Sequence, residues 1–276
     1  MRQNTIIAKR QGPWLEMKLN LVIPAAGLGS RFRAMGIDTP KPLIPVLDIP
    51  MIGWVIANFP LNDEDEIWII TRKEDHIPEQ MESAIPKIIN SIHFIEIDEL
   101  TDGAATTLQF ALDQIPGNEA VLSANSDQFI STDITEFIES VRNGISDGQI
   151  LTMYATDSKW SYIERDSNQE VINVVEKVVV SDEATVGVYG WKSATVAKNA
   201  IAAMKKDGLK VNGEFYVAPS YTYLLKQGGK ISTFNVGDVE TDVHGLGTPE
   251  DLKLFLLNSD IDTFQAMVSR NLGNRP

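Results

Sequence analysis

A glycine-rich turn followed by basic residues is the first part of the chain whose side chains suit chemistry. An apolar run over residues 19–23 stops at a proline and opens into small residues that include two glycines. Arg31 follows at once, and Lys41 comes ten residues later, between two prolines. Many α/β proteins hold phosphate with a buried strand and such a turn, because small residues let backbone N–H groups approach the oxygens. The stretch therefore predicts a phosphate-binding loop.

Asp127 is the second candidate for chemistry. The run Glu119–Ala124 reads as a buried strand, and Asn125 and Ser126 lead from it to the aspartate. Ligands of open parallel sheets bind at the carboxyl ends of the strands. Because the glycine turn and Asp127 both follow predicted strands, we expect them on one rim of one sheet.

The elements that position these residues alternate between strand and helix through the first half of the chain. This alternation at short spacing favours an α/β fold with a doubly wound, mostly parallel sheet flanked by helices. The run His76–Ile89 is expected to be a helix interrupted at Pro86, and Thr132 or Asp133 is expected to cap the helix at 131–142. The expected elements are strands at 18–23, 66–71, 91–97 and 119–124, and helices at 51–59, 76–89, 103–114 and 131–142.

The second half is expected to form a smaller lobe of short strands and a few helices. Thr248, Pro249 and Asp251 form a helix start with a capping box. We expect one domain over residues 17–258, divided into a nucleotide-binding half (17–148) and an acceptor-binding half (149–258). Residues 1–16 and 259–276 are expected to be tails, with Met17 as an alternative start. The expected elements are strands at 149–155, 161–165, 171–175, 184–191 and 230–236, and helices at 193–206 and 215–227.

Three kinds of phosphate-binding loop compete for the first stretch. A Walker A loop closes with Gly-Lys-Ser/Thr, whereas Ser30 and Arg31 follow Gly29 here. A dinucleotide-binding turn needs a third glycine and opens a helix. Phe32 stands at that position, and four prolines lie between residues 40 and 50, each costing a helix interior about 3 kcal/mol. What remains is a long loop that wraps a nucleoside triphosphate.

Two spaced segments, AAGLGSRF (25–32) and TPKPLIPVLDIPMI (39–52), together resemble the sugar nucleotidyltransferase family, with its G-x-G-[ST]-R-[FL] and K-P-L-[LI]-P signature. The resemblance extends from Met17 to about Leu257 and is nearest to compact members such as nucleotide-sugar pyrophosphorylases and phosphocholine cytidylyltransferases. It implies a Rossmann-like nucleotidyltransferase fold. It also implies that an NTP and a sugar 1-phosphate or similar small phosphate combine, with Mg²⁺ as cofactor, to give an NDP-activated product and pyrophosphate.

Carried over residue by residue, the resemblance implies that Arg31 binds the β- and γ-phosphates, that Lys41 lies near the α-phosphate and that Asp127 ligates Mg²⁺. A carboxylate that faces a triphosphate needs a cation between them. The alternative for Asp127 is a helix cap. The nucleotide-binding residues expected from the resemblance are Ala25, Ala26, Gly27, Gly29, Ser30, Arg31, Asp102, Gly103 and Ala104.

The acceptor site is expected in the second half of the chain. Glu176-Lys177 resembles the E-K pair of the family, in which Glu accepts hydroxyl groups of the second substrate and Lys meets its phosphate. Lys177 thereby joins Arg31, Lys41 and Asp127 as a catalytic residue. Gly187 matches a strand glycine that leaves room for the substrate, the alternative being a sheet bulge. The expected acceptor-binding residues are Ser161, Glu176, Lys177, Gly187 and Glu214.

Two departures from the family pattern concern the metal and the acceptor. Gly245 stands where many members carry an Asp as a second metal ligand. Asp242 is preferred to His244 as its replacement, because a lone His is more often structural; otherwise the phosphates supply the remaining ligands. Ser161 stands where sugar-binding members often have glycine. The departures leave two alternatives: a phospho-alcohol such as phosphocholine as the acceptor, or a nucleotide-binding module without catalysis. A glycosyltransferase is not supported, because the expected D-x-D motif is missing at the fourth strand.

Composition bounds the partners of the protein. The 276 residues carry a net charge of −14 and no cysteine. An acidic surface repels nucleic acid and anionic lipid, so a phosphate ligand must meet local basic groups. No apolar run approaches the ~20 residues of a membrane helix, and the lack of disulfides is compatible with a reducing cytoplasm. We expect a cytoplasmic enzyme without nucleic-acid or membrane partners. Homo-oligomer formation is left open, and the family implies a role in nucleotide-sugar and surface-polysaccharide synthesis.

Overall fold

The computed structural model describes residues 18–84 and 92–273, and a nine-stranded sheet runs through both halves of this part of the chain. The expected tail at 1–16 and the helix break at Pro86 lie outside the described residues. The strands are β1 (Leu19–Pro24), β2 (Pro45–Val46), β3 (Ile49–Pro50), β4 (Glu66–Arg72), β5 (Ile92–Ile97), β6 (Ala120–Ala124), β7 (Gln128–Ile130), β8 (Gly148–Tyr154), β9 (Ser161–Arg165), β10 (Val171–Glu176), β11 (Glu183–Trp191), β12 (Ile231–Asp238) and β13 (Val243–Gly245).

The helices follow the strands in alternation through the first half, as the sequence predicts. Short 3₁₀ turns lie at Lys41–Leu43 and Lys73–Asp75. The α-helices are α1 (Ser30–Ala34), α2 (Met51–Ala57), α3 (Ile77–Ala84), α4 (Ala104–Leu112), α5 (Thr135–Arg142), α6 (Ala194–Lys206), α7 (Ser220–Lys226), α8 (Pro249–Leu256) and α9 (Ile261–Gly273).

The sheet joins a parallel half to an antiparallel half. Strands β6, β1, β4 and β5 are parallel neighbours. The apolar runs of β6, β1 and β4 are buried on both faces, whereas β5 is partly exposed. Strand β11 then pairs antiparallel with β6, with β8 and, at Ala184, with β9. This arrangement confirms the predicted α/β class with a mostly parallel first half.

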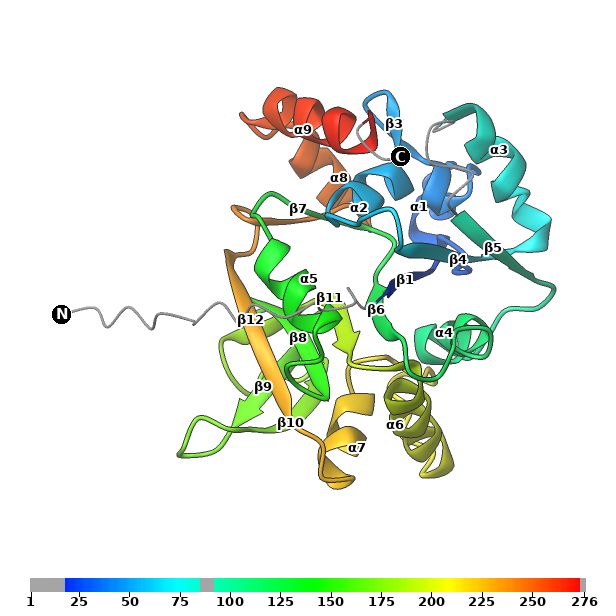
Figure 1. The fold of residues 1–276 in the computed structure, drawn as a ribbon. Helices are drawn as coiled ribbons and strands as arrows, with labels where there is room; N and C mark the ends of the chain where they lie inside the picture. Colours follow the sequence, from blue (N-terminus) through cyan, green and yellow to red (C-terminus); the bar gives the residue numbers. More distant parts are fainter. Residues whose placement is uncertain (1–17, 85–91, 274–276) are drawn as a thin grey trace.

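Helices cover both faces of the sheet (Figure 1). Apolar residues of α2, α3 and α5 pack on one face in a single cluster, and those of α4, α6 and α7 pack on the other face. A third cluster joins α2 to β7, α8 and α9 around the buried indole of Trp54, which contacts Phe129 and Phe255 edge-on. Because β1 and β6 are parallel neighbours, the loops that follow these two strands leave from the same edge of the sheet.

Three predicted boundaries differ from the structure. Helix α7 begins at Ser220, not at residue 215, because Pro219 precedes it and Val211 and Glu214 pair their backbones in a tight turn. Helix α5 begins at Thr135, whose N–H donates to Asp133. The segment expected to be a C-terminal tail forms α9, which packs on α2 at the top of Figure 1 and buries Val268 completely.

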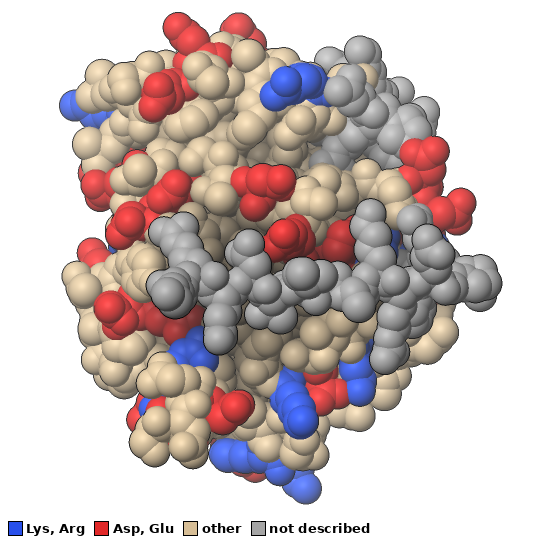
Figure 2. All heavy atoms as spheres, turned by 60° about the vertical axis from the view of Figure 1, so that its left-hand side comes forward, with Lys and Arg blue, Asp and Glu red and all other residues tan. Residues whose placement is uncertain are grey.

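The surface reflects the acidic composition of the chain. On the face shown in Figure 2, carboxylates are spread widely, while basic side chains gather towards the lower part. Among the residues that the structure describes, no helix is both long enough and apolar enough to cross a bilayer.

A buried ion pair fixes the start of β1 to α5. The Asp65 carboxylate accepts hydrogen bonds from the backbone N–H groups of Leu19 and Asn62, both at 2.9 Å, and it pairs with the Arg142 guanidinium at 2.7 Å. The side chains of Asp65 and Arg142 are 0% and 2% exposed. A pair this deeply buried is costly to break, because removal of one partner leaves the other charge without compensation.

We expect Asp65→Ala to lower the free energy of unfolding by about 3–5 kcal/mol, because it removes the buried carboxylate that offsets the Arg142 charge and leaves this buried guanidinium beside the half-exposed Glu139 carboxylate. Urea unfolding followed by circular dichroism measures the change. The exposed neighbour Asp63 provides the control, since Asp63→Ala should change the stability by no more than about 0.5 kcal/mol. Similar effects of both variants would show that the buried pair does not hold these elements together.

Candidate active site

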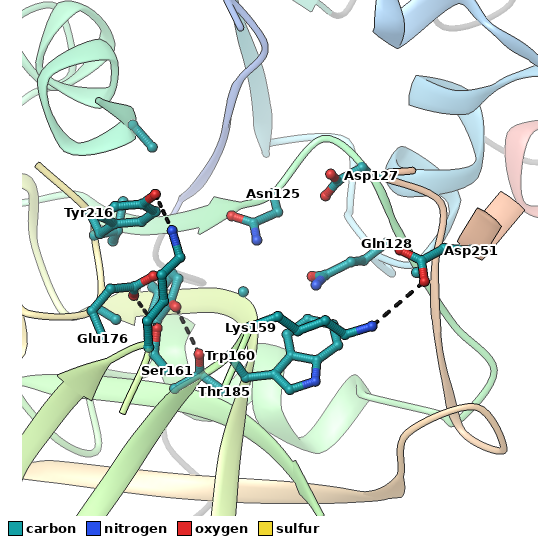
Figure 3. Close-up of a pocket in the computed structure, with 18 of the residues that line it drawn as sticks. Asn125, Asp127, Gln128, Lys159, Trp160, Ser161, Glu176, Thr185, Tyr216 and Asp251 are labelled. Carbon is teal, nitrogen blue, oxygen red and sulfur yellow. Dashed lines mark hydrogen bonds and ion pairs between the residues drawn. The ribbon is translucent and has the colours of Figure 1, made fainter. Parts of the chain in front are cut away.

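The main cleft lies beyond the carboxyl ends of β1 and β6 and has a volume of about 340 Å³. Figure 3 shows side chains that enter it from facing walls. Asp127 precedes β7 and Gln128 begins it, Trp160 precedes β9 and Ser161 begins it, and Asp251 comes from α8. Its walls therefore come from both halves of the chain. This is the rim on which the sequence places the glycine turn and Asp127.

The four residues predicted to be catalytic meet at this cleft. Arg31, Asp127 and Lys177 line it, and Lys41 forms an ion pair with Asp127. Gly247 allows the close approach, since a Cβ at this position would lie 2.3 Å from Asp127 Oδ2 and 3.5 Å from Lys41 Nζ. The structure thus concentrates cationic side chains at one place in an acidic protein.

A second cleft, of about 300 Å³, adjoins the first, and Ala104 at the start of α4 lines both. Gly103 allows the first turn of α4 to lie against the backbone of Phe215. Its φ is +131°, and a Cβ would lie 2.5 Å from the carbonyl oxygen of Phe215. The residues that line the second cleft are Pro24, Ala26, Gly27, Leu28, Ser30, Leu100, Thr101, Gly103, Ala104, Thr107 and Glu214.

Three of the predicted nucleotide-binding residues support the two clefts without lining them. Ala25 is buried, and its N–H donates to the backbone of β4. Gly29 adopts φ +62° at the start of α1, where a Cβ would lie 3.3 Å from Lys41 Cβ. The Asp102 carboxylate pairs with Lys210 at 2.9 Å and points to that partner.

Glu176 and Lys177 form one end of the main cleft. Glu176 is 8% exposed and accepts a hydrogen bond from the Ser161 hydroxyl. Burial raises the pKa of Glu176. Lys177 adopts φ +58° and donates to the hydroxyl of Tyr216, with its ammonium 4.1 Å from the centre of that ring. Two adjacent residues thus present a buried carboxylate and a cation to the same space.

Gly187 marks an irregularity in β11, where the pairing with β8 shifts between Thr185 and Tyr189. Its φ is +87°, and a Cβ would lie 2.2 Å from Asn125 Nδ2 and 2.7 Å from Gln128 Oε1. The bulge predicted as the alternative is therefore present. The space above this glycine is taken by two amide side chains of the opposite wall.

Asp242 does not reach the cleft. Its carboxylate accepts hydrogen bonds from the N–H of Asp238 at 2.9 Å and from the hydroxyl of Thr132 at 3.3 Å. The carboxylate beside Gly245 belongs to Asp251 instead, since a Cβ at Gly245 would lie 3.5 Å from Asp251 Oδ2. Asp251 lines the cleft, and the sequence assigned it only to helix capping.

Several cleft residues were missed in the sequence, and one of the predicted acceptor-binding residues lies outside the main cleft. Lys159 lies 3.6 Å from Asp251 and 5.0 Å from the centre of the Trp160 ring. No motif signals this lysine, because only the packing of its loop against α8 brings it in. Glu214, expected at the acceptor, lines the second cleft with the glycine loop. The cleft residues without a predicted role in the site include Asn125, Gln128, Lys159, Trp160, Thr185, Tyr189, Tyr216 and Asp251.

The donor set at the cleft suits a Mg²⁺ ion that arrives with a triphosphate. Within residues 18–84 and 92–273, no three carboxylate or imidazole side chains converge on one point, while Asp127 and Asp251 both line the cleft. Mg²⁺ commonly takes one or two protein carboxylates and completes its shell with substrate phosphates and water. His244, the other candidate to replace the missing second ligand, is 5% exposed, and burial lowers its pKa.

The fold is that of an α/β protein with a cleft at the carboxyl ends of parallel strands. The family model described as nucleotidyl transferase matches residues 20–215. The chain therefore belongs to the nucleotidyl transferase family.

Individual relatives are distant. UTP–glucose-1-phosphate uridylyltransferase 1 of Staphylococcus saprophyticus is 38% identical over 66 residues, which are 22% of this chain and 23% of that protein. The nucleoside-diphosphate-sugar pyrophosphorylase structure from Vibrio cholerae RC9 superposes with a TM-score of 0.71 at 22% identity, over 86% of this chain and 100% of that one. The inositol-1-phosphate CTP transferase structure from T. maritima gives 0.66 at 14% identity, over 95% and 98%. The chain spans about half the length, or less, of the curated relatives it matches.

We expect Glu176→Gln to gain stability relative to the native chain as the pH rises. Burial raises the pKa of Glu176, so the native carboxyl contributes stability below its unfolded pKa and loses that contribution as the pH rises through its folded pKa. The variant has no such loss. Melting temperatures measured from about pH 4 to pH 7 should therefore show a difference, variant minus native, that increases with pH as the pH passes from the unfolded to the folded pKa.

The exposed Glu136 provides the matched control for this measurement. The difference between Glu136→Gln and the native chain should stay flat over the same range. A flat or falling difference for Glu176→Gln would contradict the assignment of a desolvated carboxylate.

Proposed function

We propose that the protein is a nucleotidyltransferase that joins an NTP to a sugar 1-phosphate. A phosphate oxygen of the acceptor attacks the α-phosphorus of the NTP in line. A new P–O bond forms while the bond from the α-phosphorus to the oxygen bridging it to the β-phosphorus breaks, so pyrophosphate leaves and an NDP-sugar remains. The observation that carries the proposal is the meeting of Arg31, Lys41, Asp127 and Lys177 at one cleft beside the glycine loop.

The two adjoining clefts give each substrate a place. We assign the base and ribose of the NTP to the cleft between the glycine loop and Gly103, and the acceptor to the larger cleft. Ala104 lies where the two meet, so the α-phosphate would lie near the start of α4. Family membership and the likeness in fold support this division.

Electrostatic stabilisation would come from side chains already in position. Arg31 would hold the β- and γ-phosphates and the leaving pyrophosphate, Lys41 would lie at the α-phosphate, and Lys177 would hold the acceptor phosphate. Mg²⁺, when bound at Asp127, supplies neutralisation of phosphate charge. Preorganised charges of this kind contribute strongly to phosphoryl-transfer rates.

The proposed reaction needs no general base. A phosphomonoester has a second pKa of about 6 and is mostly a dianion at neutral pH, so its oxygen is already a nucleophile. The protein's task is then to position two anions against each other and to offset their repulsion. The three cationic residues Arg31, Lys159 and Lys177 that line the main cleft fit this task.

The aromatic residues of the cleft favour a sugar phosphate over phosphocholine. Recognition of a quaternary ammonium needs open aromatic faces. The Lys177 ammonium lies over the Tyr216 ring at 4.1 Å, and that of Lys159 lies near the Trp160 ring at 5.0 Å. Both faces thus already carry a positive charge that would repel a choline group.

Family membership supports a proposal for the wider setting of this activity. A protein that makes NDP-sugars would act in the cytoplasm and supply precursors of surface polysaccharide, and its acidic surface gives no basis for a nucleic-acid or membrane partner.

A screen for pyrophosphate release tests the activity directly. It crosses the four common NTPs with sugar and alcohol phosphates, phosphocholine included, in the presence and absence of Mg²⁺. Absence of release from every pair would support the alternative of a nucleotide-binding module without catalysis.

We expect Lys41→Ala and Asp127→Ala each to lower kcat for pyrophosphate release by at least ~100-fold, because each removes a charge that acts on the transferred group. Circular dichroism should show that both variants keep the fold. Two exposed residues, Asp48 and Lys253, provide charge-matched controls. Alanine at either position should leave kcat within about twofold of the native value. Turnover near the native rate in either cleft variant would refute the assigned roles.

A further inference from the structure

Gln128 lies in the wall of the main cleft with an unused hydrogen-bond acceptor. The residue is 6% exposed, and its Oε1 has no hydrogen-bond partner among the residues that the structure describes. Figure 3 shows the side chain extending into the cleft between Asn125 and Trp160. Buried polar atoms are almost always paired, because an unpaired one keeps the cost of its lost hydration. The position therefore suggests a partner that arrives with a ligand.

The backbone of Gln128 is fixed from two sides, so its side chain has a defined place. Residue 128 pairs with Gly245 between β7 and β13. Asn58 then clamps β7, as its amide donates to the Gln128 carbonyl at 2.9 Å and its Oδ1 accepts from the Ile130 N–H at 3.0 Å. A rigid strand that holds an unsatisfied oxygen is a feature of a preorganised binding site.

The facing wall presents a second acceptor. The Glu176 carboxylate is buried and takes one hydrogen bond from Ser161, which leaves further lone pairs for a ligand. The cations Arg31 and Lys177 line the same cleft. The cleft therefore combines a place for a phosphate with acceptor oxygens on two facing walls. A ligand that satisfies it carries an anion at one end and hydrogen-bond donors at the other.

We propose that Gln128 is a specificity-determining residue for the acceptor: its Oε1 accepts a hydrogen bond from a hydroxyl or N–H group on the organic part of a polyhydroxylated phosphate ester. Such a residue rejects acceptors that lack the donor, because the buried oxygen would then stay unpaired. The inference rests on the proposed function. It adds the hydrogen-bonding character that the acceptor must have.

The first measurement needs no substrate. Gln128→Leu keeps the size of the side chain and removes the unpaired oxygen, so the melting temperature of the variant should equal or exceed that of the native protein. Asn20 provides the matched control. It is 0% exposed, its Oδ1 accepts a hydrogen bond from the Trp68 indole N–H at 3.0 Å, and its Nδ2 donates to the Ala120 carbonyl at 3.2 Å, so Asn20→Leu should lower the melting temperature. A loss of several degrees in Gln128→Leu would show a structural role and overturn the proposal.

The second measurement uses the acceptor that gives most pyrophosphate in the screen, together with its deoxy analogues. Gln128→Leu should raise KM for the acceptor at least ~10-fold and leave KM for the NTP within about twofold. With the native protein, one deoxy analogue should have a higher KM than the parent acceptor. With the variant the two KM values should be equal, because the oxygen that binds the missing hydroxyl is gone. An unchanged KM for the acceptor, or phosphocholine as the best acceptor of both proteins, would overturn the proposal.

Failure of the proposed function would be seen separately. If no pair of substrates releases pyrophosphate, the same sugar and alcohol phosphates are titrated against both proteins by thermal shift. A sugar phosphate that stabilises the native protein and not Gln128→Leu would support the assigned role of Gln128 in a non-catalytic protein. An equal response of the two proteins to every compound would overturn it.

Discussion

The change of partners along β11 is the constraint on which the cleft depends. The carboxyl-terminal part of this strand pairs with β6, while its first part pairs with β9 at Ala184. One strand therefore brings the wall that holds Glu176 into register with the strand that leads to Asp127. A slip of one residue would turn every side chain of the strand to the other face. The bulge at Gly187 fits this exchange of partners, because it releases the strand locally from its ladder with β8.

The lysines of the cleft have partners within the chain. Lys41 pairs with Asp127, Lys159 with Asp251, and Lys177 bonds the hydroxyl of Tyr216. These partners hold the ammonium groups near the positions where anions would arrive, so less side-chain freedom is lost on binding. They also neutralise the cations locally. A bound anion must then compete with the existing partner, which favours ligands that carry several charges.

Much of the fold and part of the site could be predicted, because the signals are local. Apolar runs and short turns predicted the parallel strands, and the spaced glycine and lysine segments predicted the cleft at Arg31 and Asp127. Residues such as Lys159 and Gln128 could not be found in this way. Their place depends on pairing between segments far apart in the chain, such as Gly245 with Gln128, which no local pattern encodes. The extent of α9 could not be found for the same reason, since the buried side of this helix is defined by its contact with α2.

The pairing of β7 with β13 also bears on where the functional unit ends. The family match stops at residue 215, before the segment in which Gly245 pairs with Gln128 and Gly247 packs on Asp127. A fragment cut at that boundary would keep Arg31, Lys41, Asp127 and Lys177. It would lose one wall of the pocket and leave β7 as an open edge, exposed to water and to other chains. The boundary of the recognisable sequence is therefore not the boundary of the working site.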